Sequence, residues 1–240
     1  MKKVLKQVLG VDVAQGELVV TLGRMFDDLR VDLYAHKVFR NTENDILKLL
    51  DWVKKLTDPS VNVRFVMEAT GVYHQKFAFS LYAQDYEVSI VLPNKISNYM
   101  RTLENKTITD KSCSEAIAQF GLERNLDRWH KPKKTYRSLQ QLTRERDQIV
   151  MERVMVKNQL HAEQAEAEPN ERSVARLNER MRLLNKHEKE IKSDLTEIIN
   201  SDLVLKNEIT NICSIPGIGE LTATIVLAET NGFELIRNKK

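Results

Sequence analysis

The chain has 240 residues, of which 42% are hydrophobic and 30% charged, with a formal net charge of +3 and a pI near 8.7. This length allows one substantial hydrophobic core plus an elongated accessory part, and so high a charged fraction argues against a single compact globule. The mildly basic balance is consistent with a nucleic-acid partner but is too small to establish one by itself.

The two cysteines, Cys113 and Cys213, lie far apart in the sequence. They offer neither the spacing of zinc ligands nor a disulfide framework, and they therefore predict a reducing, cytoplasmic compartment. No apolar run approaches the length that crosses a membrane, and the charged N-terminal segment has no uninterrupted apolar stretch. We therefore expect a soluble protein that is not exported and has no membrane partner.

The first apolar run, residues 8–13, contains an acidic residue, Asp12. The run is typical of a buried central strand, where a carboxylate needs a partner that compensates its charge. A bound metal ion is the most economical partner. Residues 5–40 as a whole predict three strands that form an antiparallel meander, with turns at residues 15–16 and 27–28.

A crossover helix is predicted from Thr42, which forms a capping-box pattern with Asp45, to the break at residues 58–59. It leads to a second apolar run with Glu68 at its exit, then to a helix near residues 77–82 and a strand at 88–92. After a three-stranded meander, this is the ribonuclease-H-like order of elements. Ligands gather at the carboxyl ends of such strands, so the fold would bring Asp12 and Glu68 together.

A third acid, Asp110, stands at the N-terminal edge of a predicted helix, and Cys113 shares its face three residues later. Two acids on separate strands could be unrelated carboxylates that are each satisfied locally. A third acid that converges on them favours a site for a hard divalent cation. Glu115 lies about 200° around the helix from Cys113 and is expected to face away from this site.

Residues 94–109 combine three cations with an aromatic residue: Lys95, Arg101 and Lys106 accompany Tyr99. Such a mixture could hold a nucleic-acid backbone near the metal, and a solvated loop is the alternative.

Residues 126–134 predict a basic linker around Trp129, since Pro132 breaks a helix. One interpretation is a phosphate contact with stacking by Trp129, and the other is a solvated hinge with Trp129 packed against the first domain. The cations expected to contact nucleic acid are Arg128, Lys131, Lys133 and Lys134.

From Tyr136 onward, apolar residues recur at alternating three- and four-residue steps, with a break at residues 168–170. This pattern predicts a coiled coil that folds back as an antiparallel hairpin. Arg146 and Arg153 interrupt the apolar steps and do not suit a two-helix seam. We therefore expect a partner, and homo-oligomerisation through this element.

Residues 215–219 read Ile-Pro-Gly-Ile-Gly between two helical patterns. Gly217 and Gly219 permit a tight turn whose backbone N–H groups, with the N-terminus of the following helix, can accept a phosphate. The pattern resembles a helix-hairpin-helix DNA contact, and a plain connection between packed helices is the alternative.

Four motifs, in this order, resemble the DEDD-type bacterial insertion-sequence transposases, the "one-ten" family that includes the Piv/MooV invertases. The match covers most of the chain. The motifs are Gly-Val-Asp-Val at Asp12, Met-Glu-Ala-Thr-Gly-Val-Tyr at Glu68, Thr-Asp-Lys-Ser-Cys-Ser-Glu-Ala-Ile-Ala at Asp110, and Ile-Pro-Gly-Ile-Gly ending at Gly219 with Thr222 and Ala223 beyond.

The resemblance implies an α/β plus α protein. Its parts would be a RuvC-like (ribonuclease-H-like) mixed-sheet DEDD domain at 1–127, a basic linker at 128–134, a coiled-coil hairpin at 135–211 and the beginning of a helical C-terminal transposase domain at 212–240. It also implies a transposase or site-specific recombinase of the bacterial cytoplasm and nucleoid that cleaves and exchanges DNA strands. Mg²⁺ or Mn²⁺ would be its cofactor, a structured RNA its guide, and a serine of the C-terminal domain its nucleophile.

The sequence departs from the family pattern in two places. Cys113 occupies the position of the fourth acid, and the segment expected to carry the serine would lie beyond Lys240. A thiol is soft and usually protonated, so we expect weakened binding of Mg²⁺ by Asp12, Glu68 and Asp110. The alternative function is a truncated, catalytically impaired nucleic-acid-binding remnant that assembles with full-length transposase. A RuvC-like nuclease acting on branched DNA is a third possibility.

Overall fold

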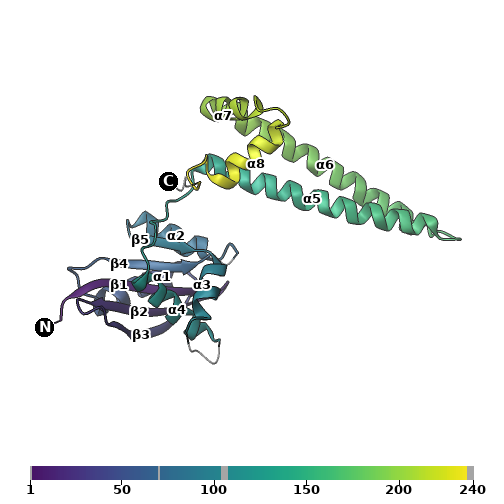
Figure 1. Ribbon diagram of the computed structural model, residues 1–240. Helices are drawn as coiled ribbons and strands as arrows, with labels where there is room; N and C mark the ends of the chain where they lie inside the picture. Colours follow the sequence, from purple (N-terminus) through teal and green to yellow (C-terminus); the bar gives the residue numbers. More distant parts are fainter. Residues whose placement is uncertain (1, 70, 104–107, 237–240) are drawn as a thin grey trace. The chain divides into compact units, whose positions relative to one another are not determined.

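The computed structural model describes residues 2–69, 71–103 and 108–236, and the chain divides into two compact units, Met1–Lys131 and Pro132–Lys240 (Figure 1). The division falls inside the basic linker predicted at 128–134. Each unit has its own hydrophobic core, so each is described by itself.

The first unit is built on a five-stranded mixed sheet with the order β3-β2-β1-β4-β5. The first three strands pair antiparallel, while β4 is parallel to β1 and β5 is parallel to β4. The predicted meander followed by parallel strands is confirmed. The strands are β1 (Val4–Val13), β2 (Glu17–Phe26), β3 (Val31–Arg40), β4 (Val63–Glu68) and β5 (Glu87–Val91).

Helices pack against both faces of this sheet. On one face, Leu9 and Met67 join a core with residues of α1 (Glu43–Leu56) and α2 (His74–Ala83). On the other face, Val8 packs with residues of α3 (Pro93–Met100) and α4 (Asp110–Glu123). Because successive side chains of a strand alternate between faces, burial on both sides explains the continuous apolar run in β1.

Helix α3 covers the first part of residues 94–109, a segment for which a solvated loop was one of two interpretations and no helix was predicted. Pro93 opens the helix, a position that suits proline because its missing N–H needs no partner there. Ile96 and Tyr99 are the residues that α3 buries, one turn apart. The remaining positions are mostly polar and exposed, which hid the short helical period in the sequence. Lys106 lies outside the described residues.

The second unit contains two long helices, α5 (Lys134–Ala165) and α6 (Glu171–Ser201), joined at the predicted break. They run antiparallel and side by side (Figure 1), because Arg153 contacts Asn185 while Gln159, further along α5, contacts Arg180. None of the described helices is both long enough and apolar enough to cross a bilayer.

Helix α6 ends at Ser201, before residue 211, where the predicted coiled-coil hairpin ends. Asp202 stops α6 and its side chain accepts hydrogen bonds from Val204 N and Leu205 N, so a new helix begins there. This helix, α7 (Leu203–Cys213), and α8 (Glu220–Thr230) share a core with the two long helices.

A buried carboxylate explains the two arginines that interrupt the apolar pattern. Glu188 of α6, whose side chain is 7% exposed, accepts hydrogen bonds from Arg146 (3.3 Å) and Arg153, and Lys192 lies 2.9 Å from it. These bonds, first from Lys192 and then from Arg153, hold the pKa of Glu188 below its ordinary value. The misplaced arginines are thus neutralised within one chain and do not call for a partner chain. Homo-oligomerisation through these helices stays a prediction.

We expect Glu188→Gln to lower the free energy of unfolding by about 2–4 kcal/mol, because it leaves Arg153 without a carboxylate and Arg146 with only the exposed Asp147, 3.3 Å away. Urea denaturation followed by circular dichroism measures the change. Glu190→Gln is the matched control: its exposed pair with Lys186 should contribute less than about 0.5 kcal/mol. Equal effects of the two substitutions would contradict this account.

Candidate metal centre

Two of the three predicted acids stand side by side at one edge of the sheet. In the parallel pair of β1 and β4, Val11 lies opposite Met67, and Asp12 and Glu68 are the next residues on their strands. Neighbouring strands are about 4.8 Å apart. Because Val8 and Val66 point towards the α4 face, the alternation of side chains places Asp12 and Glu68 on that face as well.

Two glycines let α4 lie directly on this face. A Cβ atom on Gly10 would stand 2.3 Å from the backbone nitrogen of Ala118 and 2.4 Å from the carbonyl oxygen of Ser114. One on Gly121 would stand 2.9 Å from a methyl carbon of Val8. The backbone of α4 therefore touches β1, and its first turn is carried towards the end of the strand. The sequence analysis missed this role, although a glycine inside an apolar strand signals a close approach of another backbone.

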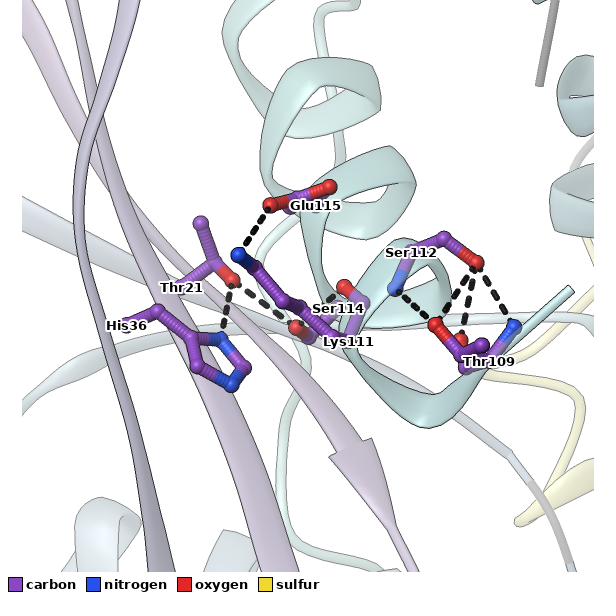
Figure 2. Close-up of polar contacts among 7 residues, drawn as sticks. All are labelled: Thr21, His36, Thr109, Lys111, Ser112, Ser114 and Glu115. Atoms are coloured by element: carbon purple, nitrogen blue, oxygen red, sulfur yellow. Dashed lines mark hydrogen bonds and ion pairs between the residues drawn. The ribbon is translucent and has the colours of Figure 1, made fainter. Parts of the chain in front are cut away.

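A capping box decides where α4 begins (Figure 2). Ser112 N donates to the Thr109 hydroxyl at 3.2 Å, and Thr109 N donates to Ser112 Oγ at 2.8 Å. These two bonds satisfy N–H groups that a helix start leaves open. Asp110 is thereby the first residue of the helix, where the helix dipole favours a negative charge.

The four side chains share one electrostatic environment. Burial, and then the charges of Asp110 and Glu68, raise the pKa of Asp12 to about 6. Burial, and then Asp12, Glu68 and Asp110, raise the pKa of the Cys113 thiol. Asp12 and Cys113 are therefore influenced by the charges of the other acids, and Cys113 keeps its proton at neutral pH. The convergence of the acids on one cation stays a prediction.

Within the described residues, no three or more His, Cys, Asp or Glu side chains are arranged to hold one metal ion. The expected cage of three shared carboxylates is thus not preformed there. Mg²⁺, however, commonly uses one or two carboxylates and completes its shell with waters and substrate phosphates. A cation would also relieve the repulsion that raises the pKa of Asp12. The carboxylates fit Mg²⁺ or Mn²⁺ in this manner, whereas the protonated thiol adds no hard ligand.

A chain of polar contacts, which the sequence analysis did not predict, joins α4 to β2 and β3 (Figure 2). Ser114, fully buried, donates to the carbonyl oxygen of Lys111 at 2.8 Å, and its hydroxyl lies 2.8 Å from that of Thr21 on β2. The Thr21 hydroxyl is 3.2 Å from Nδ1 of His36 on β3. Glu115 points to Lys111, 3.7 Å away, so its charge is engaged there.

The sequence of this unit and part of the next matches a known family. Residues 9–164, well over half of the chain, match the model of the IS110-type DEDD transposases, described as "Transposase". The chain belongs to this transposase family.

Two relatives are similar over nearly all of this transposase-family chain. The pilin gene-inverting protein of Moraxella lacunata is 23% identical over 233 residues, which are 95% of this chain and 68% of that protein. Its counterpart in Moraxella bovis is 24% identical over 218 residues, 90% of this chain and 64% of that protein. The chain therefore spans about two thirds of the length of these relatives.

Solved structures of RuvC from Thermus thermophilus are also similar. One of them, in complex with a Holliday junction substrate, is 9% identical with a TM-score of 0.37, and the other is 10% identical with a TM-score of 0.39. Each similarity covers 51% of this chain and 99% of RuvC.

The cations predicted to bind nucleic acid near the acids occupy different places. Arg101 follows α3 and lines a pocket that also contains Glu68. Lys95 is exposed on α3 and lines a separate hollow with Tyr99, whose hydroxyl donates to Glu123 at 2.8 Å.

Trp129 packs against the sheet unit, the second of the two interpretations of the basic linker. Its ring stacks on Phe79 with centroids 5.7 Å apart, meets Tyr82 edge-on at 5.9 Å, and its backbone nitrogen donates to Val88 O at 2.7 Å. One face of the indole is thus covered by Phe79, and contact of Trp129 with nucleic acid stays a prediction.

The other linker cations also have contacts within their own units. Arg128 pairs with Asp85 at 2.6 Å, and Lys131 lies 4.9 Å from the centre of the Phe79 ring. In the second unit, Lys133 pairs with Glu234 at 2.9 Å, and Lys134 begins α5. Contact of these residues with nucleic acid stays a prediction.

The glycine turn lies between α7 and α8. Gly217 has a φ of 89°, a conformation that favours glycine, and Gly219 is the N-cap of α8. A Cβ atom on either would meet nothing within 4 Å, so the turn is open on its outer side. Its role as a phosphate contact stays a prediction.

Proposed function

We propose that this chain carries the DNA-cleaving carboxylates of a bacterial insertion-sequence recombinase. Membership in the transposase family supports a DNA substrate. The observation that carries the proposal is the adjacency of Asp12 and Glu68 at the carboxyl ends of β1 and β4, where burial, and then the charges of Asp110 and Glu68, raise the pKa of Asp12 to about 6. Carboxylates gathered in this way suit phosphodiester chemistry that depends on a divalent cation.

Each acid has a distinct support. Asp12 stands on a central strand and Glu68 at the exit of its neighbour, so the sheet fixes their separation. Asp110 comes from the capped start of α4. These three would hold Mg²⁺ or Mn²⁺, which when bound offsets the charge of the scissile phosphate and lowers the pKa of the attacking hydroxyl. The partial burial of Asp12 strengthens the interactions of its own charge with the other acids.

The proposal extends to the finer features that the family resemblance implies. These are strand exchange guided by a structured RNA, a serine nucleophile from a C-terminal domain, and assembly of several copies through a coiled coil formed by α5 and α6. Lys95 and Arg101 in the first unit, and the turn at Gly217 and Gly219 in the second, are the surfaces that would contact nucleic acid.

Cys113 favours a second candidate function, a catalytically impaired protein that binds nucleic acid and assembles with complete transposase. Its thiol stands among the carboxylates and keeps its proton, so it cannot contribute the charge of a fourth acid. The site would then bind a cation weakly while the nucleic-acid surfaces remained intact.

We expect Cys113→Asp to tighten Mg²⁺ binding by at least about tenfold, the lower end of the effect of supporting groups at metal sites. Calorimetric titration of the 240-residue chain measures the affinity, and Mg²⁺-dependent nicking of a labelled four-way junction measures cleavage. Gln119→Glu is the matched control, because it adds the same charge two turns later on α4 and should change neither quantity.

The outcomes separate the two functions. Cleavage by the wild-type chain that rises in the Cys113→Asp variant supports the recombinase, while DNA binding with cleavage only in the variant supports the impaired protein. If Mg²⁺ binds neither chain and neither cuts DNA, the proposal of a metal-dependent recombinase is wrong.

A further inference from the structure

A pocket of about 660 Å³ opens beside Glu68 at the start of α3. This volume lies within the range of sites that bind small molecules and cofactors. Most of its wall comes from α3 and the residues that flank this helix. Among these wall residues, Arg101 is the one to which the proposed function gives a role. Glu68 is the residue that the pocket shares with the carboxylate group, so an occupant of the pocket lies next to the reacting centre.

The larger part of the wall is apolar. Ile96 is buried, and Met100 and Leu103 are partly buried beside it. Ile108 lines the same pocket with 78% of its surface exposed. A hollow lined mainly by apolar side chains is typical of ligand sites, and a flat apolar occupant would cover this one.

Polar groups complete the wall and indicate the class of occupant. Asn94 and Ser97 supply an amide and a hydroxyl, which can both donate and accept hydrogen bonds. Arg101 supplies a guanidinium group, whose planar fork matches a phosphate. These groups together match a nucleotide. The apolar surface suits the faces of the base, the donors and acceptors suit its edge, and the guanidinium group suits its phosphate.

We propose that this pocket binds one unpaired nucleotide of the DNA strand that is cut. The base lies against Ile96, Met100 and Leu103, and the phosphate lies between Arg101 and the carboxylates. This inference rests on the proposed function, because a nucleotide seated here brings its backbone to Glu68. Taking a base out of the stack has a free-energy cost, and contacts with the apolar wall offset it.

A comparison of two oligonucleotides tests the inference without any metal. A single-stranded thymidine oligomer of about twelve nucleotides and an abasic oligomer of the same length carry the same phosphates, and they differ only in the bases. In EDTA, we expect the wild-type chain to bind the thymidine oligomer about tenfold more tightly, near the lower end of what an aromatic ring contributes per stacked base, because this wall is aliphatic. Fluorescence anisotropy measures both dissociation constants.

Ser97→Phe fills the pocket with a side chain that cannot leave it, and it should reduce the ratio of the two affinities to nearly one. Asn98→Phe is the matched control, because the next residue of the same helix lines a different hollow and should keep the tenfold ratio. Arg101→Gln should weaken both oligomers by a similar factor, since it removes a phosphate contact. Both Ser97 and Asn98 are exposed, so either variant should fold.

A tenfold ratio that survives Ser97→Phe overturns the inference, and so does a ratio of one in the wild-type chain. Failure here is distinct from failure of the recombinase proposal, which depends on Mg²⁺ binding and cleavage with Cys113→Asp.

Discussion

Replacing Asp12 by asparagine should make the metal-free protein more stable at neutral pH and should abolish its stabilisation by Mg²⁺. Partial burial of the Asp12 carboxylate, and then the charges of Asp110 and Glu68, raise its pKa to about 6. Above that pH, Asp12 is ionised in the folded protein, where its charge is less favourable than in the solvated unfolded chain. Asparagine has a similar shape and no charge, so it removes this penalty.

The sign of the pH dependence follows from proton binding. Between the ordinary pKa of an aspartate, about 4, and the raised value of about 6, the folded protein binds a proton that the unfolded chain has lost. The contribution of Asp12 to stability therefore falls as the pH rises through this window and is constant above it. A shift of roughly two units corresponds to about 3 kcal/mol, which solvent screening at this partly buried site reduces to about 1–3 kcal/mol.

Urea denaturation in EDTA at several pH values measures the difference between wild type and Asp12→Asn. The two should agree near pH 4 and diverge by about 1–3 kcal/mol at pH 7. In saturating Mg²⁺ the wild-type chain should gain stability and the variant should not. A ligand stabilises a folded protein only if that protein binds it, and the variant lacks the Asp12 carboxylate.

Asp28→Asn is a matched control, because the pKa of Asp28 is lowered whereas that of Asp12 is raised. Asp28 is exposed, and a hydrogen bond from Lys2 lowers its pKa, so its removal should not stabilise the protein at pH 7. If Asp12→Asn is no more stable than wild type in EDTA, the carboxylates do not repel one another as described. If Mg²⁺ stabilises the variant equally, Asp12 is not a ligand.

Gly10→Ala should lower the free energy of unfolding by about 3 kcal/mol or more, the upper end of the effects of overpacking. The new methyl group would stand 2.3 Å from Ala118 N and 2.4 Å from Ser114 O, which are backbone atoms of α4 and cannot swing aside. The helix must move away from β1 as a whole. Its first turn moves with it, so the influence of Asp110 on the pKa of Asp12 should weaken.

Two other glycines supply a graded comparison. A methyl group on Gly23 would meet the tip of the Leu33 side chain at 2.7 Å, which can shift, so its effect should be intermediate. One on Gly16 would meet nothing within 4 Å and should change stability by less than about 0.5 kcal/mol.

Denaturation curves of the three alanine variants should rank Gly10, Gly23 and Gly16 in decreasing order of loss. NMR titration of Asp12 in the Gly10→Ala variant, at a temperature where it stays folded, should give a pKa nearer the ordinary value. A Gly10→Ala protein with wild-type stability would show that α4 does not rest on the strand.

Sequence patterns predicted the elements whose burial is regular. Residues 8–13 are apolar on both sides because β1 is central, and the helical spacing after Thr42 is clear because α1 buries one face. The order of these elements was enough to place Glu68 beside Asp12, since the ends of adjacent parallel strands meet.

Sequence patterns were least informative for residues whose contacts lie far away in the chain. The positions of Arg146 and Arg153 suggested a partner chain or nucleic acid. Their actual partner, Glu188, is more than thirty residues away, and its burial depends on how α5 and α6 pack. Trp129 read equally well as a stacking residue, because only the folded unit brings Phe79 and Tyr82 to it.

By itself, the sequence determined which residue types could form the site: acids at strand ends and at a helix start. These are local features, set by chain order, side-chain alternation and capping. Only the resemblance to the family marked Cys113 as the position of a fourth acid. Only the tertiary structure decided how the acids influence one another, because their mutual effect on pKa depends on distance and burial across residues 12 to 110. The close approach of α4 over Gly10 and the pocket beside Glu68 arise in the same way, from the packing of distant backbone segments.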